Sequence, residues 1–222
     1  MLAALAQATK RLRMGVLVTG IHYRHPAVLA NMAATIDIIS GGRLDIGVGA
    51  GWNMTESEAY GIELGSLKER SDRFEEGIQV LASLLANETT DFDGTYYQLK
   101  QATCNPKPVQ KPHPPICVGG SGAKRTLLTT AKYAQHWNFS FGGVDDFKNS
   151  RDILHQHCAD VGRDPSEILL SSHITYDGDP ESTAATAAEF GEAGIELAII
   201  YLHPPYSTDI LERTAEALAK IV

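Results

Sequence analysis

The chain has 222 residues, 43% hydrophobic and 21% charged, and a formal charge of −8 at neutral pH. This composition excludes intrinsic disorder, because the apolar surface is large enough to offset the entropy lost on ordering. The acidic balance argues against a nucleic-acid-binding protein, and no stretch approaches the roughly 18 apolar residues that a membrane span needs.

The chain begins with MLAALAQATKRLR, which is apolar first and basic second, the reverse of a signal peptide. We therefore predict a helix over residues 2–11, with Lys10, Arg11 and Arg13 complementing its dipole. A second helix begins at Pro26, because the first turn tolerates proline, and ends at Gly41-Gly42.

The tetrapeptide Ser66-Leu-Lys-Glu69 is a capping box, and it predicts a helix that continues through Leu85. Four more helices follow the same helical spacing of apolar residues. They are expected at about residues 123–134, 145–161, 180–192 and 207–221.

Six short apolar runs alternate with these helices. Because the runs are continuous, each strand should be buried on both faces, which is typical of a parallel sheet covered by helices. A doubly wound sheet and a (β/α) barrel both fit, although a closed barrel needs eight strands. The strands are expected at residues 14–19, 43–48, 116–119, 136–140, 168–175 and 195–202.

Residues 87–115 interrupt this alternation. Asp93-Gly94 predicts a hairpin with a tight turn, and five of the ten prolines follow between Pro106 and Pro115. We interpret the segment as a surface insertion within a single domain that covers residues 1–222.

The first glycine-rich loop, Gly47-Val-Gly49-Ala-Gly51-Trp52, follows a predicted strand. It is not a dinucleotide fingerprint, because Trp52 stands where the third glycine would be. The loop predicts either a tight turn or a close approach of backbone to a ligand. Trp52 would either stack on a flat ring or fill the core, and the sequence leaves both open.

The second loop runs from Gly119 to Gly122, with Lys124 and Arg125 one turn later. Free N–H groups and the positive end of a helix dipole would form an anion nest there. It is not a Walker A loop, because no Gly-Lys-Ser/Thr follows. We favour a phosphate site over a plain turn.

The histidines give no strong catalytic pattern. His155 and His157 lie two residues apart on a predicted helix, so they do not share a face, and we expect them to be solvated. His173 is more consistent with a core histidine than with a residue at a barrel mouth. His22 and His25 follow the first strand, where catalytic groups of barrels gather, although His25 could cap the next helix.

Cys104, Cys117 and Cys158 are far apart in the sequence, odd in number and without a CxxC pair. This usage argues against disulfides and zinc and favours a reducing cytoplasm. No G-x-S-x-G elbow is present, and no residue is assigned as catalytic.

The run RLRMGVLVTGIHYRHPAVLANMAATIDIISGGRLDIGVGAGWN resembles the bacterial-luciferase-like monooxygenase family, most closely its branch that uses the deazaflavin coenzyme F420. The stretches SLKERSDRFEEGIQVL, FDGTYYQL…PKPVQKPHPPICVGGSG and AKYAQHWN extend the resemblance over essentially the whole chain. It implies a TIM barrel with an insertion before the fifth strand. It also implies F420, or FMN as the alternative, bound at the carboxyl-terminal mouth.

By position, the resemblance assigns three cofactor-binding segments. The first strand would back the flavin ring, and relatives often carry a non-proline cis peptide there. The first glycine loop would line the ring or its side chain, and the second would hold the phosphate. The implied residues are Leu17, Val18, Thr19, Gly20, Ala50, Gly51, Trp52, Gly119, Gly120, Ser121 and Gly122.

The chain departs from the family at its start, since relatives have two more strands before this point. The six strands would be strands three to eight of the barrel, and the chain would be N-terminally truncated. The absent part usually carries an Asp-His pair near the ring. Trp52 also stands where F420-dependent sugar-phosphate dehydrogenases have a glutamate, which argues against that activity.

The resemblance implies an oxidoreductase or monooxygenase that uses F420 or FMN to transfer a hydride or activate O₂ on a small organic substrate. The alternative is a catalytically inactive cofactor-binding protein or a truncated fragment. A cytoplasmic homodimer without nucleic-acid or membrane partners is expected.

Overall fold

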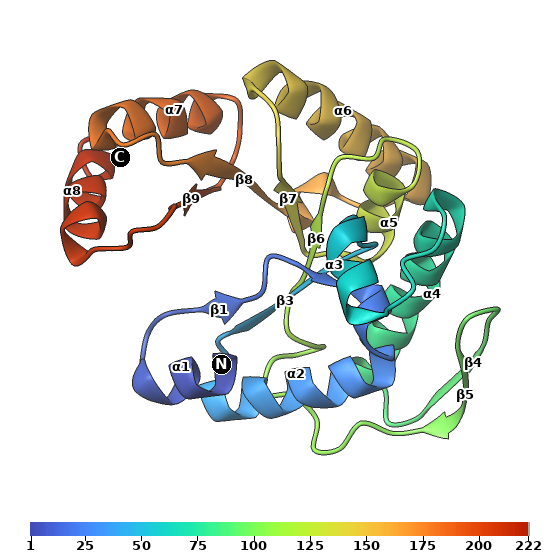
Figure 1. The fold of residues 1–222 in the computed structure, drawn as a ribbon. Coiled ribbons are helices and arrows are strands. Elements are labelled where there is room, and N and C mark those ends of the chain that lie inside the picture. Colours follow the sequence, from blue (N-terminus) through green and yellow to red (C-terminus); the bar gives the residue numbers. More distant parts are fainter. Residues whose placement is uncertain (222) are drawn as a thin grey trace. The chain divides into compact units, whose positions relative to one another are not determined.

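The computed structural model describes residues 1–221, which divide into two compact units (Figure 1). Unit 1 comprises Met1–Gly119 and Lys132–Gln135, and unit 2 comprises Gly120–Ala131 and His136–Val222. The single domain expected from the sequence stays a prediction.

Unit 1 is built on a parallel sheet. Its central strand β3 (Leu44–Gly49) pairs on one side with β6 (Ile116–Gly119). On the other side it pairs with β1 (Met14–Gly15) and then with β2 (Thr19–Gly20). The strand predicted over residues 14–19 is therefore two short pieces along one neighbour.

The break between β1 and β2 shifts the register by one residue. Gly15 pairs with Asp45, an offset of 30, whereas Thr19 pairs with Val48, an offset of 29. Between them the Leu17–Val18 peptide bond is cis, as the family resemblance led us to expect. A side chain at Gly47 would place its Cβ 1.8 Å from the carbonyl oxygen of Val16, so only glycine fits there.

The helices of unit 1 follow the predicted capping signals. Pro26 opens α2, and Gly41 ends it in the left-handed conformation at φ 67°. The Ser66–Glu69 capping box is formed in full at the start of α4. The helical elements are α1 (Leu2–Ala8), η1 (Ile21–Tyr23), α2 (Pro26–Ser40), α3 (Met54–Tyr60) and α4 (Leu67–Ala86).

The first helix is shorter than predicted, and its dipole partner is a different residue. α1 ends at Ala8, with no basic residue in its last turn, so the roles assigned to Lys10, Arg11 and Arg13 are wrong. Arg13 instead pairs with Asp45 at 2.8 Å. The Arg43 guanidinium instead donates to the carbonyls of Ala6 at 2.8 Å and Thr9 at 3.1 Å. A cation from a distant loop thus satisfies the orphan carbonyls of α1.

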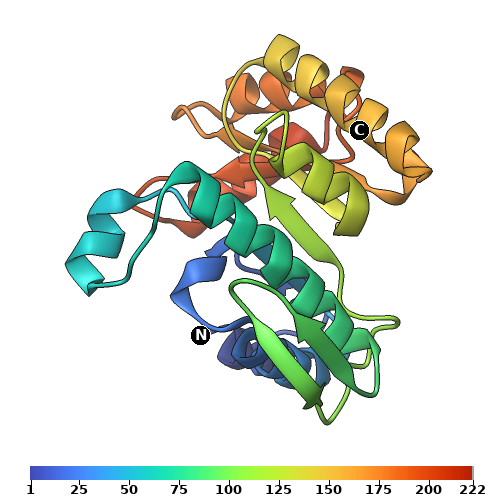
Figure 2. The ribbon, with the colours of Figure 1, turned by 90° about the vertical axis from the view of Figure 1, so that its right-hand side faces the viewer.

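The predicted hairpin is present as β4 (Thr90–Asp93) and β5 (Gln98–Ala102), but its turn is longer than expected. Asp93 pairs with Gln98, which leaves residues 94–97 as a four-residue loop. The Glu76 carboxylate of α4 accepts from the N–H groups of this loop, at 2.9 Å from Thr95 and 2.8 Å from Tyr96. Figure 2 shows the hairpin lying along α4, which supplies that anchor.

Unit 2 holds three parallel strands, in which β8 (Leu169–Thr175) lies between β7 (His136–Phe139) and β9 (Leu197–Tyr201). The strands predicted at residues 136–140, 168–175 and 195–202 are confirmed, with each end within two residues of the predicted one. The helical elements are α5 (Thr126–Tyr133), α6 (Val144–Val161), η2 (Pro165–Glu167), α7 (Pro180–Glu192) and α8 (Thr208–Leu218).

The core of unit 2 is aromatic. Trp137 stacks on Phe147 with ring centroids 5.7 Å apart, and Phe139 and Phe190 meet Phe147 edge to face. These rings are all buried. Edge and stacked geometries of this kind add to the free energy gained by burying the rings.

Within residues 1–221, no helix is both long and apolar enough to cross a membrane.

We predict that Gly47→Ala destabilises the chain by about 3 kcal/mol or more, because the added methyl overlaps the Val16 carbonyl. Thermal denaturation followed by circular dichroism measures the loss. The control is Gly191→Ala in α7, where a Cβ meets nothing within 4 Å. That variant should gain about 0.5–1 kcal/mol from helix propensity. Equal stability of the two variants would contradict the account of the β1–β2 break.

Candidate functional site

In unit 1, the carboxyl ends of β2 and β3 meet around the ring of His22. A Cβ at Gly20 or at Gly51 would lie 2.5 Å from the Cε1 atom of this ring. Gly51 also has φ +89°, which favours glycine. Gly51 of the first loop therefore leaves room for the ring of His22, a residue of the chain itself. This agrees with the tight turn that the sequence allowed.

Trp52 follows this turn and is 78% exposed. This exposure excludes the alternative in which Trp52 fills the core. Ala50 and Gly51 before it are half-buried, and Arg70 of α4 donates to the Gly51 carbonyl at 3.2 Å. The turn thus presents a free indole beside two small residues, an arrangement in which a flat ring can stack.

Unit 1 has two hollows. The larger, of about 910 Å³, is mostly apolar and is lined by Val16 and Thr19 of the first strand segment, Val28 and Met32 of α2, and Ile46 of β3. Thr19 is the one predicted cofactor residue that borders it. An apolar wall of this size suits a ring system.

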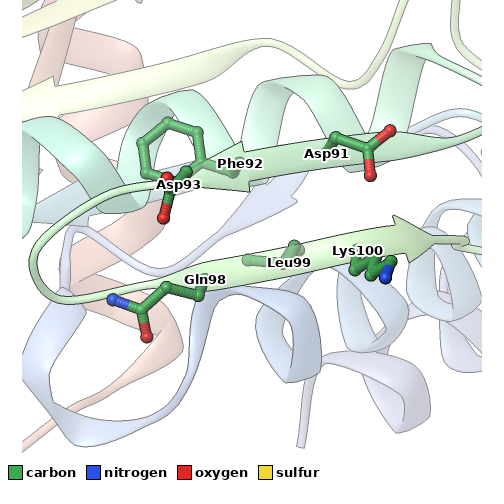
Figure 3. Close-up of a pocket in the computed structure, with 6 residues that line it drawn as sticks. All are labelled: Asp91, Phe92, Asp93, Gln98, Leu99 and Lys100. Atoms are coloured by element: carbon green, nitrogen blue, oxygen red, sulfur yellow. The ribbon is translucent and has the colours of Figure 1, made fainter.

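The smaller hollow, of about 580 Å³, lies on the hairpin and is lined by three residues from each strand (Figure 3). Two of its polar side chains are bonded within the hairpin itself. Asp91 accepts from the backbone N–H of Gln101 at 2.8 Å, and the Gln98 amide donates to the Gly94 carbonyl at 2.6 Å. We do not assign a function to it.

In unit 2, residues 120–124 form the predicted nest before α5. The N–H groups of Ser121, Gly122 and Ala123 make no hydrogen bond within residues 1–221. Ser121, Gly122 and Lys124 are exposed. Three free backbone donors and one cation at a helix N-terminus can hold a phosphate group.

The nest is fixed from the core of unit 2. Gly120 donates to the Asn138 carbonyl at 3.1 Å, and the Trp137 indole donates to the Gly120 carbonyl at 2.8 Å. Gly120 has φ +112°, so a larger residue there would be strained. A Cβ at Gly122 would lie 2.8 Å from the Thr126 hydroxyl.

His173 on β8 is a half-buried histidine. Its Nδ1 atom is buried without a partner, and the imidazole makes no hydrogen bond within residues 1–221. The Tyr201 ring of β9 lies 6.1 Å away, and His203 lies 4.8 Å beyond Tyr201. Burial lowers the pKa of His173, so the imidazole is neutral at pH 7.

Side chains along β8 point alternately to its two faces, which explains the position of His173. Leu170 and Ile174 point into the apolar core of unit 2, so Ser171 and His173 lie on the opposite face. Ser171 is used by its neighbours, because it bonds His136 at 2.6 Å and Asn138 at 2.9 Å.

His25 and His157 have hydrogen-bond partners within the fold. His25 caps α2 by accepting from the Ala27 N–H at 3.1 Å, which confirms the capping interpretation. His155 and His157 are half-buried instead of solvated, and His157 bonds the Ala123 carbonyl at 2.8 Å. Within residues 1–221, no three His, Cys, Asp or Glu side chains gather as a metal site would require.

The predicted cofactor residues fall in both units, and their role stays a prediction. In unit 1, the first strand and the first glycine loop meet through the pairing of β2 with β3. This group comprises Leu17, Val18, Thr19, Gly20, Ala50, Gly51 and Trp52, and unit 1 also ends its main segment at Gly119. Gly120, Ser121 and Gly122 belong to unit 2.

Comparison with known sequences identifies relatives over most of the chain. The chain is 31% identical over 186 residues to the FMNH(2)-dependent dimethylsulfone monooxygenase of Pseudomonas putida, covering 76% of this chain and 50% of that protein. It is 33% identical over 202 residues to the pyrimidine monooxygenase RutA of Escherichia coli, covering 88% of this chain and 59% of that protein. The chain thus spans between half and three fifths of these relatives.

Comparison with solved structures shows the fold. An F420-dependent secondary alcohol dehydrogenase matches 99% of this chain and 82% of its own, with a TM-score of 0.89 at 21% identity. The coenzyme F420-dependent tetrahydromethanopterin reductase of Methanopyrus kandleri matches 99% and 86%, with a TM-score of 0.86 at 17% identity. The expected α/β fold of the luciferase-like barrel type is confirmed.

The family model for luciferase-like monooxygenases matches residues 1–218, nearly the entire chain. With the two curated relatives above 30% identity, this match decides the family. The chain belongs to the luciferase-like monooxygenase family.

Proposed function

We propose that this chain binds coenzyme F420, or FMN as the alternative, and acts as an oxidoreductase on a small organic substrate. The observation that carries the proposal is the nest at residues 120–124, whose three unused N–H groups and exposed Lys124 suit the phosphate common to both cofactors. When bound, the cofactor supplies hydride transfer or O₂ activation.

The chain's own residues would bind and orient this group. As the family resemblance implies, Ala50, Gly51 and Trp52 would line the ring. Within unit 2, the neutral His173 would hydrogen-bond a polar atom of a bound molecule. The unpaired nitrogen of a neutral imidazole can donate or accept one hydrogen bond, depending on the tautomer. We also propose that the protein works as a cytoplasmic homodimer.

A second candidate is a protein that binds the cofactor without turnover. Trp52 favours it, because an exposed indole supplies stacking but no proton transfer at the position after the glycine loop. The two candidates share the binding step and differ only in the chemistry that follows.

Fluorescence titration with F420 and with FMN tests the proposal. We expect saturable binding of one cofactor to a chain whose circular dichroism shows it folded, and the tighter ligand names the cofactor. Consumption of the reduced cofactor with substrate would then separate the enzyme from the inactive binder. A folded chain that binds neither would reject both candidates.

We predict that Lys124→Glu weakens cofactor binding about tenfold, because it replaces an attraction of the phosphate by a repulsion near the surface. The control is Lys148→Glu, an exposed lysine of α6 that makes the same charge change in unit 2. The ratio of the two dissociation constants is the measurement. A ratio near one would place the phosphate elsewhere.

We predict that His173→Leu lowers cofactor affinity or turnover while the free energy of unfolding stays equal or rises by up to about 1 kcal/mol, since a buried unpaired nitrogen is removed. The control is His136→Leu, which breaks the 2.6 Å bond to Ser171 and should cost about 1–3 kcal/mol. Urea denaturation measures both. A loss of stability in His173→Leu as large as the control's would make His173 structural.

A further inference from the structure

The helix α3 is held to unit 1 with almost no apolar burial. Ser57 is its one buried residue, and the other six are exposed. A helix of seven residues is not stable alone, so contacts with its neighbours decide where it lies. We call residues 51–61, which include the Gly51–Trp52 turn and α3, the α3 arm.

Two side chains of η1 contact the α3 arm. His22 lies 3.3 Å from the Ser57 hydroxyl through its Nε2 atom, and the Tyr23 hydroxyl donates to the Glu56 carboxylate. The two rings lie against one another, with centroids 4.1 Å apart. η1 itself is firmly placed, since Ile21 is fully buried and packs against Gly77 of α4.

The second nitrogen of His22 fixes the tautomer. Nδ1 is buried without a partner and faces Gly20 and Gly51, whose Cβ atoms would lie 2.8 Å and 2.6 Å from it. No acceptor for a proton lies there, so Nδ1 carries a lone pair and Nε2–H donates to Ser57. A second proton on this ring would create a buried donor without a partner.

We infer that His22 is a positioning residue whose neutral imidazole holds the α3 arm over the carboxyl ends of β2 and β3, and that protonation of this ring releases the arm. The inference concerns the chain alone. Its consequence for cofactor binding, through the exposed Trp52 next to Gly51, rests on the proposed function.

Two arginines near the ring act in the same direction as its burial. The pKa of His22 is lowered chiefly by burial, then by Arg73, with a smaller contribution from Arg70. Glu56 of α3 opposes this, and its carboxylate is already bound by Tyr23. The folded chain therefore takes up a proton at lower pH than an unfolded histidine of pKa about 6.5. Stability from the neutral ring is complete above that pH and falls as the pH drops toward the lowered pKa.

Trp52 gives a direct readout without any cofactor. The chain has two tryptophans, and Trp137 is fully buried in unit 2 whereas Trp52 is exposed. The emission of Trp52 is obtained by subtracting the spectrum of the Trp52→Phe variant. It is recorded between pH 5 and 8 over the range in which the circular dichroism of the chain stays constant.

We expect one titration step in Trp52 emission with its midpoint below 6.5. The step should vanish in His22→Gln, whose amide can still bond Ser57 but does not titrate. Ser57→Ala should show the low-pH emission at every pH, because its arm has lost the tether. The control His155→Gln, which removes another histidine whose pKa is lowered by burial, should keep the step.

A flat emission profile in the unsubstituted chain, or a step that persists in His22→Gln, would overturn the inference. Titration of F420 and FMN at pH 8 keeps the proposed function separate. If the Trp52 step follows His22 and neither cofactor binds, the positioning role stands and the proposed function fails. If a cofactor binds and the step does not follow His22, the positioning role fails.

Discussion

The Val16 carbonyl oxygen occupies the space that a side chain at position 47 would need. The Val16 carbonyl lies close to Gly47, and the first strand pairs with β3 as two pieces, β1 and β2, with a register shift between them. The shift decides which residues reach the end of β3 together with Gly20. Most of what is distinctive in unit 1, including the glycine run and the seat of His22, depends on that one contact.

The sequence predicted the regular elements well wherever a local signal sets their ends. Pro26, Gly41 and the Ser66–Glu69 box each act through backbone groups within one turn, so the sequence contains their partners. The end of α1 is different. Its carbonyls are satisfied by Arg43, more than thirty residues away, and no local pattern reveals such a partner. The hairpin loop was misjudged for the same reason, since Glu76 supplies its hydrogen bonds.

The candidate site shows the same division. The nest could be predicted, because glycines between a strand and a helix place free N–H groups at a helix start. The turn at Gly51 could be predicted, but not that a histidine ring fills the space beside it. α3 was missed altogether, because six of its seven residues face solvent and give no apolar periodicity. His173 was read as a core residue, since a strand pattern does not say which face meets helices.

The indole of Trp137 joins the aromatic core of unit 2 to the backbone of the nest through its bond to the Gly120 carbonyl. The cradle is thereby pre-organised, and the entropy of ordering it is lost when the chain folds instead of when a ligand arrives. If the nest binds a phosphate as proposed, packing in the core contributes to its affinity. Substitutions that loosen the stacked rings of Trp137 and Phe147 would then weaken the binding of an anion that contacts neither ring.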